Sequence, residues 1–231
     1  MRIALFAALL GASVPAPVAA AKDVEYVRAA EFRIQFPVPA NAAELRGTFE
    51  RIDAAFRDAA ADGARAKVKL RTVDGEMHRG EDRYLFGAVR RSHERRDNYE
   101  SFSRDDRVCI RTGADEEFDC ADRGVIYALY RPSWDALVSG TQREVACGRA
   151  RCTKLTLVFA EAIDLELENL PPRVFSTEPD VAGTRITLLA TLPGMRPVTL
   201  EQLDHYKDGE QATATYVYDL DADVGTIALP E

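Results

Sequence analysis

From Ala64 onward the chain consists mainly of short segments in which apolar and polar residues alternate. A period of two is typical of β-strands with one buried face. The first such segment runs from Ala64 to Arg71, and the Asp74-Gly75 pair after it is typical of a hairpin turn. Further strands are predicted at 84–86, 94–103, 107–112, 117–121, 125–130, 155–159, 163–167, 186–192, 212–218 and 226–229. Such a succession of short strands favours an antiparallel sheet.

One stretch before these segments has a helical period instead. Leu45, Phe49, Ile52 and Phe56 recur at intervals of four, three and four residues, which places them on one apolar face. We therefore predict an amphipathic helix over residues 42–61.

The ends of two helices have recognisable capping residues. Asn41 followed by Glu44 has the spacing of an N-terminal capping box. A second, short helix is predicted near the middle of the chain, with Ser133 as its cap and Gly140 as its stop.

A separate strand is predicted at 32–36, before the first helix.

These elements define one fold class. Because no Gly- or Ser-rich linker and no internal repeat interrupts residues 22–231, we predict a single domain of the α+β class. Its curved antiparallel sheet, shaped like half a barrel, would be covered by the N-terminal amphipathic helix and the short mid-chain helix.

The first 21 residues have the composition of a secretory signal peptide. Arg2 supplies a positive charge, an apolar run follows from Ile3 to Ala12, and the segment ends in small residues at Ala21. The run is shorter than the roughly 20 residues of a membrane-spanning helix, and no later run reaches about 18 residues. We expect cleavage near Ala21 and a soluble periplasmic or secreted protein.

The charge of the chain narrows the classes of partner. Lys and Arg number 30 against 38 Asp and Glu, which gives a net charge of −8. A nucleic-acid partner is disfavoured, because an acidic chain repels phosphate at long range.

Basic residues nevertheless gather in two short segments, and we predict that they bind an anionic headgroup or an acidic protein. These candidates are Arg65, Lys67, Lys69, Arg71, Arg90, Arg91, Arg95 and Arg96. The alternative is a solvated face neutralised by acidic residues elsewhere, such as Asp164, Glu166 and Glu168.

Four cysteines form two close pairs, Cys109 with Cys120 and Cys147 with Cys152. Each pair flanks a turn-like segment, so that two hairpins would bring the sulfur atoms together. Export favours disulfides, while the spacing alone also permits a zinc site.

Residues suited to catalysis or to a resident metal are sparse. The three histidines, His78, His93 and His205, lie far apart in the sequence, and there is no G-x-S-x-G motif. The alternating aspartates from Asp219 to Asp223 resemble a calcium loop, but Val224 and Pro230 occupy the positions that require Gly and Glu. We expect no enzymatic activity, no cofactor and no metal.

The order of these elements resembles the periplasmic lipoprotein carriers of the LolA/LolB type and their lipid-binding relatives. The resemblance covers the layout of residues 32–229 and implies an incomplete barrel, curled around an apolar cavity that helices cover. It implies binding of an apolar or amphiphilic ligand, such as a lipid or a lipoprotein acyl chain, without chemical transformation.

A curved sheet with a helix over its concave face would itself form a compartment for such a ligand. The residues that we expect to line it are Phe49, Ile52, Phe56, Trp134 and Leu137. The alternative is that they simply fill the core. The protein would then be an envelope protein-interaction module, with a solid interior, that uses its basic strand face.

Overall fold

The computed structural model describes residues 38–97, 99–104, 107–122, 134–160 and 181–230, all within one compact unit, Ile34–Glu231. The predicted signal peptide, the predicted strands at 32–36, 125–130 and 163–167, and Ser133 lie outside these residues. The described elements are α2 (Ala42–Ala60), β1 (Ala64–Arg71), β2 (Met77–Phe86), β3 (Arg90–Arg96), β4 (Tyr99–Arg104), β5 (Arg107–Arg111), β6 (Asp119–Ala121), the 3-10 turn η1 (Trp134–Ala136), β7 (Leu137–Cys147), β8 (Ala150–Phe159), β9 (Val181–Thr191), β10 (Pro197–Tyr206) and β11 (Gln211–Asp219).

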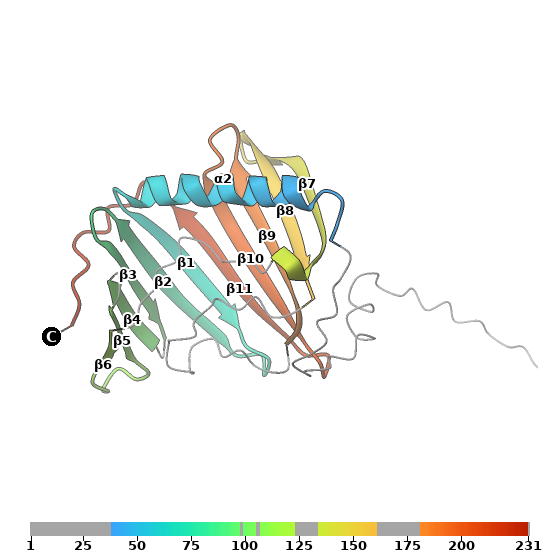
Figure 1. The fold of residues 1–231 in the computed structure, drawn as a ribbon. Helices are drawn as coiled ribbons and strands as arrows, with labels where there is room; N and C mark the ends of the chain where they lie inside the picture. The colour runs from blue at the N-terminus through green and yellow to red at the C-terminus, as the bar shows by residue number, and fades with distance from the viewer. Residues whose placement is uncertain (1–37, 98, 105–106, 123–133, 161–180, 231) are drawn as a thin grey trace, which may run out of the picture. The chain divides into compact units, whose positions relative to one another are not determined.

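The described strands form one antiparallel sheet of 11 strands in the order β6-β5-β4-β3-β2-β1-β11-β10-β9-β8-β7. Two meanders, β1–β6 and β7–β11, are joined where β1 pairs with β11. The helix α2 lies across one face of the sheet, from β7 and β8 at its beginning to β1 and β2 at its end (Figure 1). We call the face that α2 covers the inner face and the opposite face the outer face. The predicted α+β class and the large antiparallel sheet are confirmed.

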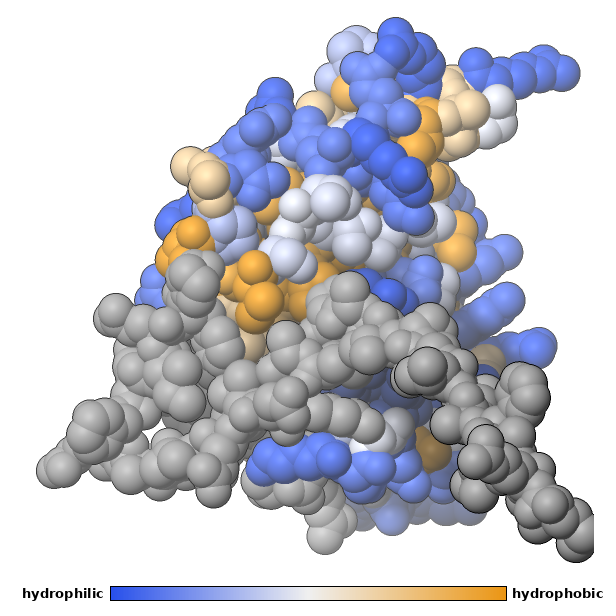
Figure 2. Space-filling model, turned by 90° about the vertical axis from the view of Figure 1, so that its right-hand side faces the viewer, coloured by the Kyte–Doolittle hydropathy of each residue, from blue (hydrophilic) through white to orange (hydrophobic). Residues whose placement is uncertain are grey.

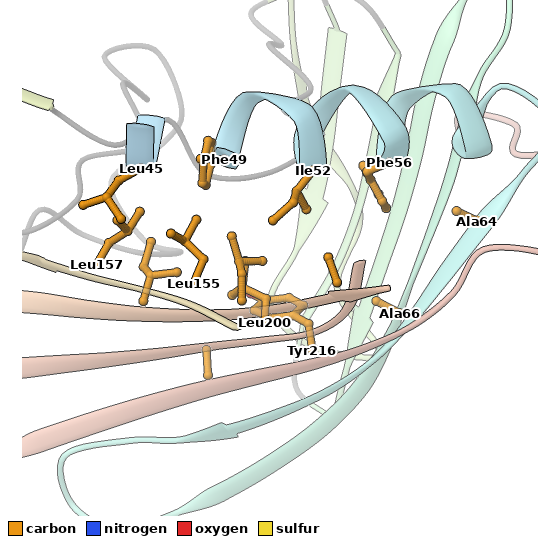
Figure 3. Packing of buried hydrophobic residues seen from close by; sticks show 14 of the residues in the cluster. Leu45, Phe49, Ile52, Phe56, Ala64, Ala66, Leu155, Leu157, Leu200 and Tyr216 are labelled. Atoms are coloured by element: carbon orange, nitrogen blue, oxygen red, sulfur yellow. The ribbon is translucent and has the colours of Figure 1, made fainter. Parts of the chain in front are cut away.

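The inner face and α2 share one hydrophobic core. The apolar side chains of α2 point toward the sheet, where Leu155, Leu157 and Leu200 meet them (Figure 3). The predicted helix is confirmed to within one residue at its end. Asn41 occupies the N-cap position without a side-chain cap, and its amide instead donates to the carbonyl of Gly140 at 3.4 Å.

The predicted mid-chain helix is wrong within the described residues. Only Trp134–Ala136 form a 3-10 turn, and the strand β7 begins at Leu137. Gly140 is not a helix stop but a strand residue beneath α2. A Cβ atom there would lie 2.5 Å from Leu45 Cδ1 and 3.1 Å from the carbonyl oxygen of Thr156. The close approach of α2 therefore explains this glycine better than helix termination does.

Several strand boundaries also differ from the prediction. The segment 94–103 contains the end of β3 and most of β4, because the chain reverses after Arg96. The strand β2 begins at Met77 rather than at Tyr84, and residues 226–229 form no strand. The strands β7 and β10 were not predicted. Charged residues on the inner face, Asp82, Glu94 and Arg96, interrupt the simple apolar alternation in β2 and β3, and this is why the alternation does not predict the limits of these strands.

Both predicted cysteine pairs are disulfides in the structure. Cys109 and Cys120 are direct neighbours across β5 and β6, with their Cα atoms 4.0 Å apart. Cys147 lies opposite Ala150, so that its bond to Cys152 crosses the β7–β8 hairpin diagonally with a Cα separation of 5.9 Å. The sequence therefore predicted the pairing but not the second register.

Two glycine-to-alanine exchanges test the contact between α2 and the sheet. Gly140→Ala should lower the free energy of unfolding by about 1–3 kcal/mol, because the new methyl group overpacks a filled core. Gly47→Ala is the matched control within α2, where a Cβ meets nothing within 4 Å. It should raise stability by about 0.5–1 kcal/mol through helix propensity. Urea denaturation of both variants measures these changes, and equal effects would contradict the assigned contact.

Candidate binding surfaces

The outer face of β1–β5 is rich in basic residues. Alternation turns Ala64, Ala66 and Val68 of β1 inward and the residues between them outward. The cross-strand register extends this outward set through the neighbouring strands. We call the outward Lys and Arg residues of β1–β5 the basic face: Arg65, Lys67, Lys69, Arg71, Arg79, Arg83, Arg91, Arg95, Arg104, Arg107 and Arg111. The acidic residues among them are Glu81 and Glu100.

One cross-strand row of the basic face, called the neutralised row below, is largely neutralised by its own acidic residues. It runs in register through Lys67, Glu81, Arg95, Glu100 and Arg111, so that basic and acidic residues alternate from β1 to β5. Such opposite-charge neighbours stabilise a sheet.

Hydrogen bonds hold the acidic members of this row. Glu100 binds His93 Nε2 at 2.8 Å and accepts from Arg111 Nε at 2.9 Å. Burial raises the pKa of Glu100, but these bonds outweigh it and hold the pKa below its ordinary value. Arg83 Nε donates to Glu81 at 2.8 Å.

The structure separates the eight predicted anion-binding residues. Six of them lie on the basic face: Arg65, Lys67, Lys69, Arg71, Arg91 and Arg95. Arg90 and Arg96 belong to the opposite side of β3, because consecutive strand residues point to opposite faces. Arg65 is also engaged with Asp219, whose carboxylate accepts from Nη2 at 2.7 Å. The predicted acidic counterparts Asp164, Glu166 and Glu168 lie outside the described residues.

The sequence analysis did not select five residues of the basic face: Arg79, Arg83, Arg104, Arg107 and Arg111. Two of them lie on β2, whose first half was not predicted as a strand. The alternation of charge with small or apolar residues was the available signal, but it becomes informative only when the register is known.

Arg96 instead forms a buried ion pair on the inner face. Its guanidinium makes two bonds to the Asp82 carboxylate, the one from Nη2 measuring 3.0 Å, and both side chains are almost fully buried. Tyr84 donates its hydroxyl to Asp82 at 3.2 Å. Gly80 makes room for this arrangement, since a Cβ there would lie 2.7 Å from Arg96 Cδ and still closer to the carbonyl of Arg95.

Glu94 adds a second carboxylate to this polar interior. It lies directly opposite Asp82 across β2 and β3. Burial, together with the negative charge of Asp82, raises the pKa of Glu94 to about 7, and Arg96 opposes the shift. The network reaches α2 through Tyr84, whose ring packs against Phe56 with 5.2 Å between ring centroids.

The five predicted ligand-contacting residues lie between α2 and the sheet. Phe49, Ile52, Phe56 and Leu137 are at most 5% exposed, and Trp134 is half-buried. The Trp134 ring makes edge contacts with Phe49, at a centroid distance of 5.7 Å, and with Phe159. Their packing is that of a filled core, and a ligand-binding role stays a prediction.

A groove of about 660 Å³ lies beside the C-terminal half of α2. Its charged lining residues are Asp58, Asp62, Arg196, Asp221 and Asp223. None of the five predicted ligand-contacting residues lines it.

Seen from the side of β7, hydrophobic residues also gather in the middle of the surface, with hydrophilic residues above them (Figure 2).

Within the described ranges, no three His, Cys, Asp or Glu residues are placed to hold a metal ion together. Asp219 pairs with Arg65, and Asp221 accepts from Arg196 Nη2 at 2.6 Å. Among the described helices, none combines the length and the apolar composition of a membrane-crossing segment.

No protein-family model matches the chain, and the comparison with curated proteins found no similar sequence. Solved structures with a related layout include MucB, at a TM-score of 0.47 and 12% identity, covering 81% of this chain and 63% of MucB. A Pseudomonas aeruginosa MucA/MucB complex aligns at 0.43 and 14% identity, over 76% of this chain and 56% of that one. This chain therefore spans less than two thirds of the MucB chains that it matches.

The matches also include proteins of the LolA type, the family whose layout the sequence resembles. A putative outer membrane lipoprotein-sorting protein domain from Vibrio parahaemolyticus aligns at a TM-score of 0.32 and 8% identity, over 78% of this chain and 92% of that one. A LolA superfamily protein from Nitrosomonas europaea aligns at 0.26 and 7%, over 72% and 90%. At these values the likeness is one of layout alone.

The position of Glu94 predicts an unusual pH dependence of stability. Because the pKa of Glu94 is raised in the folded protein, its protonated form does not oppose folding below its ordinary pKa of 4.5. As the pH rises through about 7, Glu94 ionises in the folded protein and the stability is reduced. Glu94→Gln should therefore be more stable than the wild type at pH 8, by roughly 1–3 kcal/mol, and similar to it at pH 4.5. Denaturant titrations at both pH values measure the difference.

Glu100→Gln is the matched control, because the pKa of Glu100 is lowered and its ionised form favours folding. Its stabilising contribution is present above the ordinary pKa and is lost as the pH falls, so this variant should be less stable than the wild type at pH 8. If Glu94→Gln were also less stable at pH 8, the buried position of Glu94 would be wrong.

Proposed function

We propose that the protein is a non-enzymatic binding protein of an exported compartment, and that its basic face binds an acidic protein partner. The observation that carries the proposal is the concentration of Lys and Arg on the outer face of β1–β5 in a chain of net charge −8. Since the total is negative, the rest of the chain carries a large excess of acidic residues. The basic face is thus a region of net positive charge in a chain whose total charge is negative.

A localised basic surface favours an acidic partner for two physical reasons. It accelerates encounter with a negatively charged surface, and it aligns the partner on one side of the molecule. Most of these residues are arginines, which bind carboxylates through two parallel hydrogen bonds. Lys67, Lys69, Arg71 and Arg79 are exposed side chains, so a partner reaches them without any rearrangement of the core.

The interior supports partner binding more directly than ligand binding. The apolar part of the inner face is occupied by α2, whose side chains Ile52 and Phe56 are fully buried against it. The inner face of β2 and β3 instead carries the Asp82, Glu94 and Arg96 network. An acyl chain gains little free energy from contact with such polar groups.

A labelled acidic peptide tests the proposed function. Fluorescence anisotropy with a glutamate-rich peptide should show saturable binding that weakens as the salt concentration rises, because salt screens exposed charges. Exchange of Lys67, Lys69, Arg71 and Arg79 for Ser should weaken it at least threefold. The control variant removes the same charge at exposed arginines of α2 and the β7–β8 hairpin, namely Arg46, Arg51, Arg143 and Arg149. Equal losses in both variants, or no binding by the wild type, would argue against the proposal.

A second candidate function is binding of an amphiphilic ligand between α2 and the sheet. Half-buried Trp134 favours it, since its ring joins the beginning of α2 to the inner face through Phe49 and Phe159. A displacement of α2 would expose these rings, and each CH2 group of an acyl chain buried there would contribute about 0.8 kcal/mol.

Trp134 is the single tryptophan of the chain and therefore a specific reporter of this site. Titration with a palmitoyl-chain ligand should change its fluorescence saturably, and Phe49→Ala should alter the affinity. Native mass spectrometry of gently purified protein should then show bound lipid. Protein that stays free of ligand across a panel of lipids would exclude this second function and leave the first untouched.

A further inference from the structure

The basic face contains a row of arginines that differs in its charges from the neutralised row. Arg91 lies directly opposite Arg104 across β3 and β4, and Arg104 lies directly opposite Arg107 across β4 and β5. We call these three residues the arginine row. Like charges placed directly opposite each other destabilise a sheet, so their arrangement needs a compensating partner.

The described part of the chain does not supply that partner. The ion pairs of this region use other members of the basic face: Glu81 binds Arg65 and Arg83, and Glu100 binds Arg111. No described carboxylate pairs with a member of the arginine row. Arg104 and Arg107 are exposed, and Arg91 is half-buried.

From this arrangement we infer that the arginine row anchors an extended acidic peptide segment, through carboxylates two residues apart. The inference rests on the proposed function and names the part of the basic face that determines its specificity. Neighbouring strands are about 4.8 Å apart, so the three arginines span roughly 10 Å. In an extended chain, side chains on one side repeat about every 6.8 Å. Two such carboxylates fit within the span, and arginine side chains are long enough for their guanidinium groups to converge on them.

The basic face also contains another pair of like-charged direct neighbours, Lys69 and Arg79 on β1 and β2. It carries less charge and includes a lysine, which binds a carboxylate as a point charge rather than with a planar pair of donors. It therefore serves as the internal reference. The arginine row should determine affinity, whereas the β1–β2 end should contribute mainly long-range attraction.

The test compares variants by anisotropy with a fluorescein-labelled peptide in which Glu alternates with Ser, at 150 mM salt. Replacing Arg91, Arg104 and Arg107 together with Ser should weaken binding more than tenfold. The corresponding change at Lys69, Arg71 and Arg79 should weaken it less than the arginine-row variant does. The triple Lys variant of the arginine row keeps the charge and should still lose at least threefold, because the bidentate geometry is gone.

Three results would overturn the inference while leaving the proposed function intact. One is a greater loss from the β1–β2 variant than from the arginine-row variant. Another is undiminished binding by the triple Lys variant. A third is a more than tenfold gain in peptide affinity when Asp105 and Asp106 are changed to Asn. These two residues separate Arg104 from Arg107 in the sequence, and such a gain would mean that their carboxylates already bind the arginine row in the wild type.

Two further controls complete the design. A Gln-for-Glu version of the peptide should not bind. Phosphatidylglycerol vesicles should not be retained more strongly than the peptide, and vesicle binding that depends on the arginine row in the absence of peptide binding would overturn the inference in favour of a lipid surface. Failure of the wild type to bind any acidic peptide would contradict the proposed function as well.

Discussion

The packing of α2 against the inner face is the interaction on which the rest of the structure depends. A sheet of 11 strands has two faces, and only burial of one of them against another element gives it a hydrophobic core. The apolar stripe of α2 provides that burial, with Ile52 and Phe56 fully inaccessible and Gly140 accommodating Leu45 at close range. Once this face is fixed, the period of two along each strand fixes which residues face outward.

The distribution of charge follows from the same constraint. On β1, Ala64, Ala66 and Val68 are buried, so the basic residues between them must lie on the outer face. Pairing with β2 to β5 then extends this surface across five strands, and the register decides which charges become neighbours. One row alternates in sign and is neutralised, while the arginine row is not. The difference between the neutralised row and the proposed binding row is therefore a matter of register rather than of composition.

The charged residues on the inner face of β2 and β3 contribute little net stability. Arg96 lies on the inner side of β3, where its guanidinium binds Asp82. Glu94 lies directly opposite Asp82 on the neighbouring strand. A buried ion pair gains little net stability, because desolvation offsets the attraction between the charges. Glu94, for which the described residues offer no hydrogen-bond partner, opposes folding when it is ionised. The network is linked to α2 through Tyr84, which donates to Asp82 and packs against Phe56.

The sequence by itself determined the local features: the helix from its period, most of the strands from theirs, the two disulfide pairs from their spacing, and the presence of basic clusters in an acidic chain. These follow from interactions between residues close in the chain. Only the tertiary structure decided that Gly140 lies in a strand beneath α2, that Arg96 is buried, and that Arg91, Arg104 and Arg107 form one row. Strand register and the approach of a helix depend on pairing between distant segments, which local periodicity does not specify.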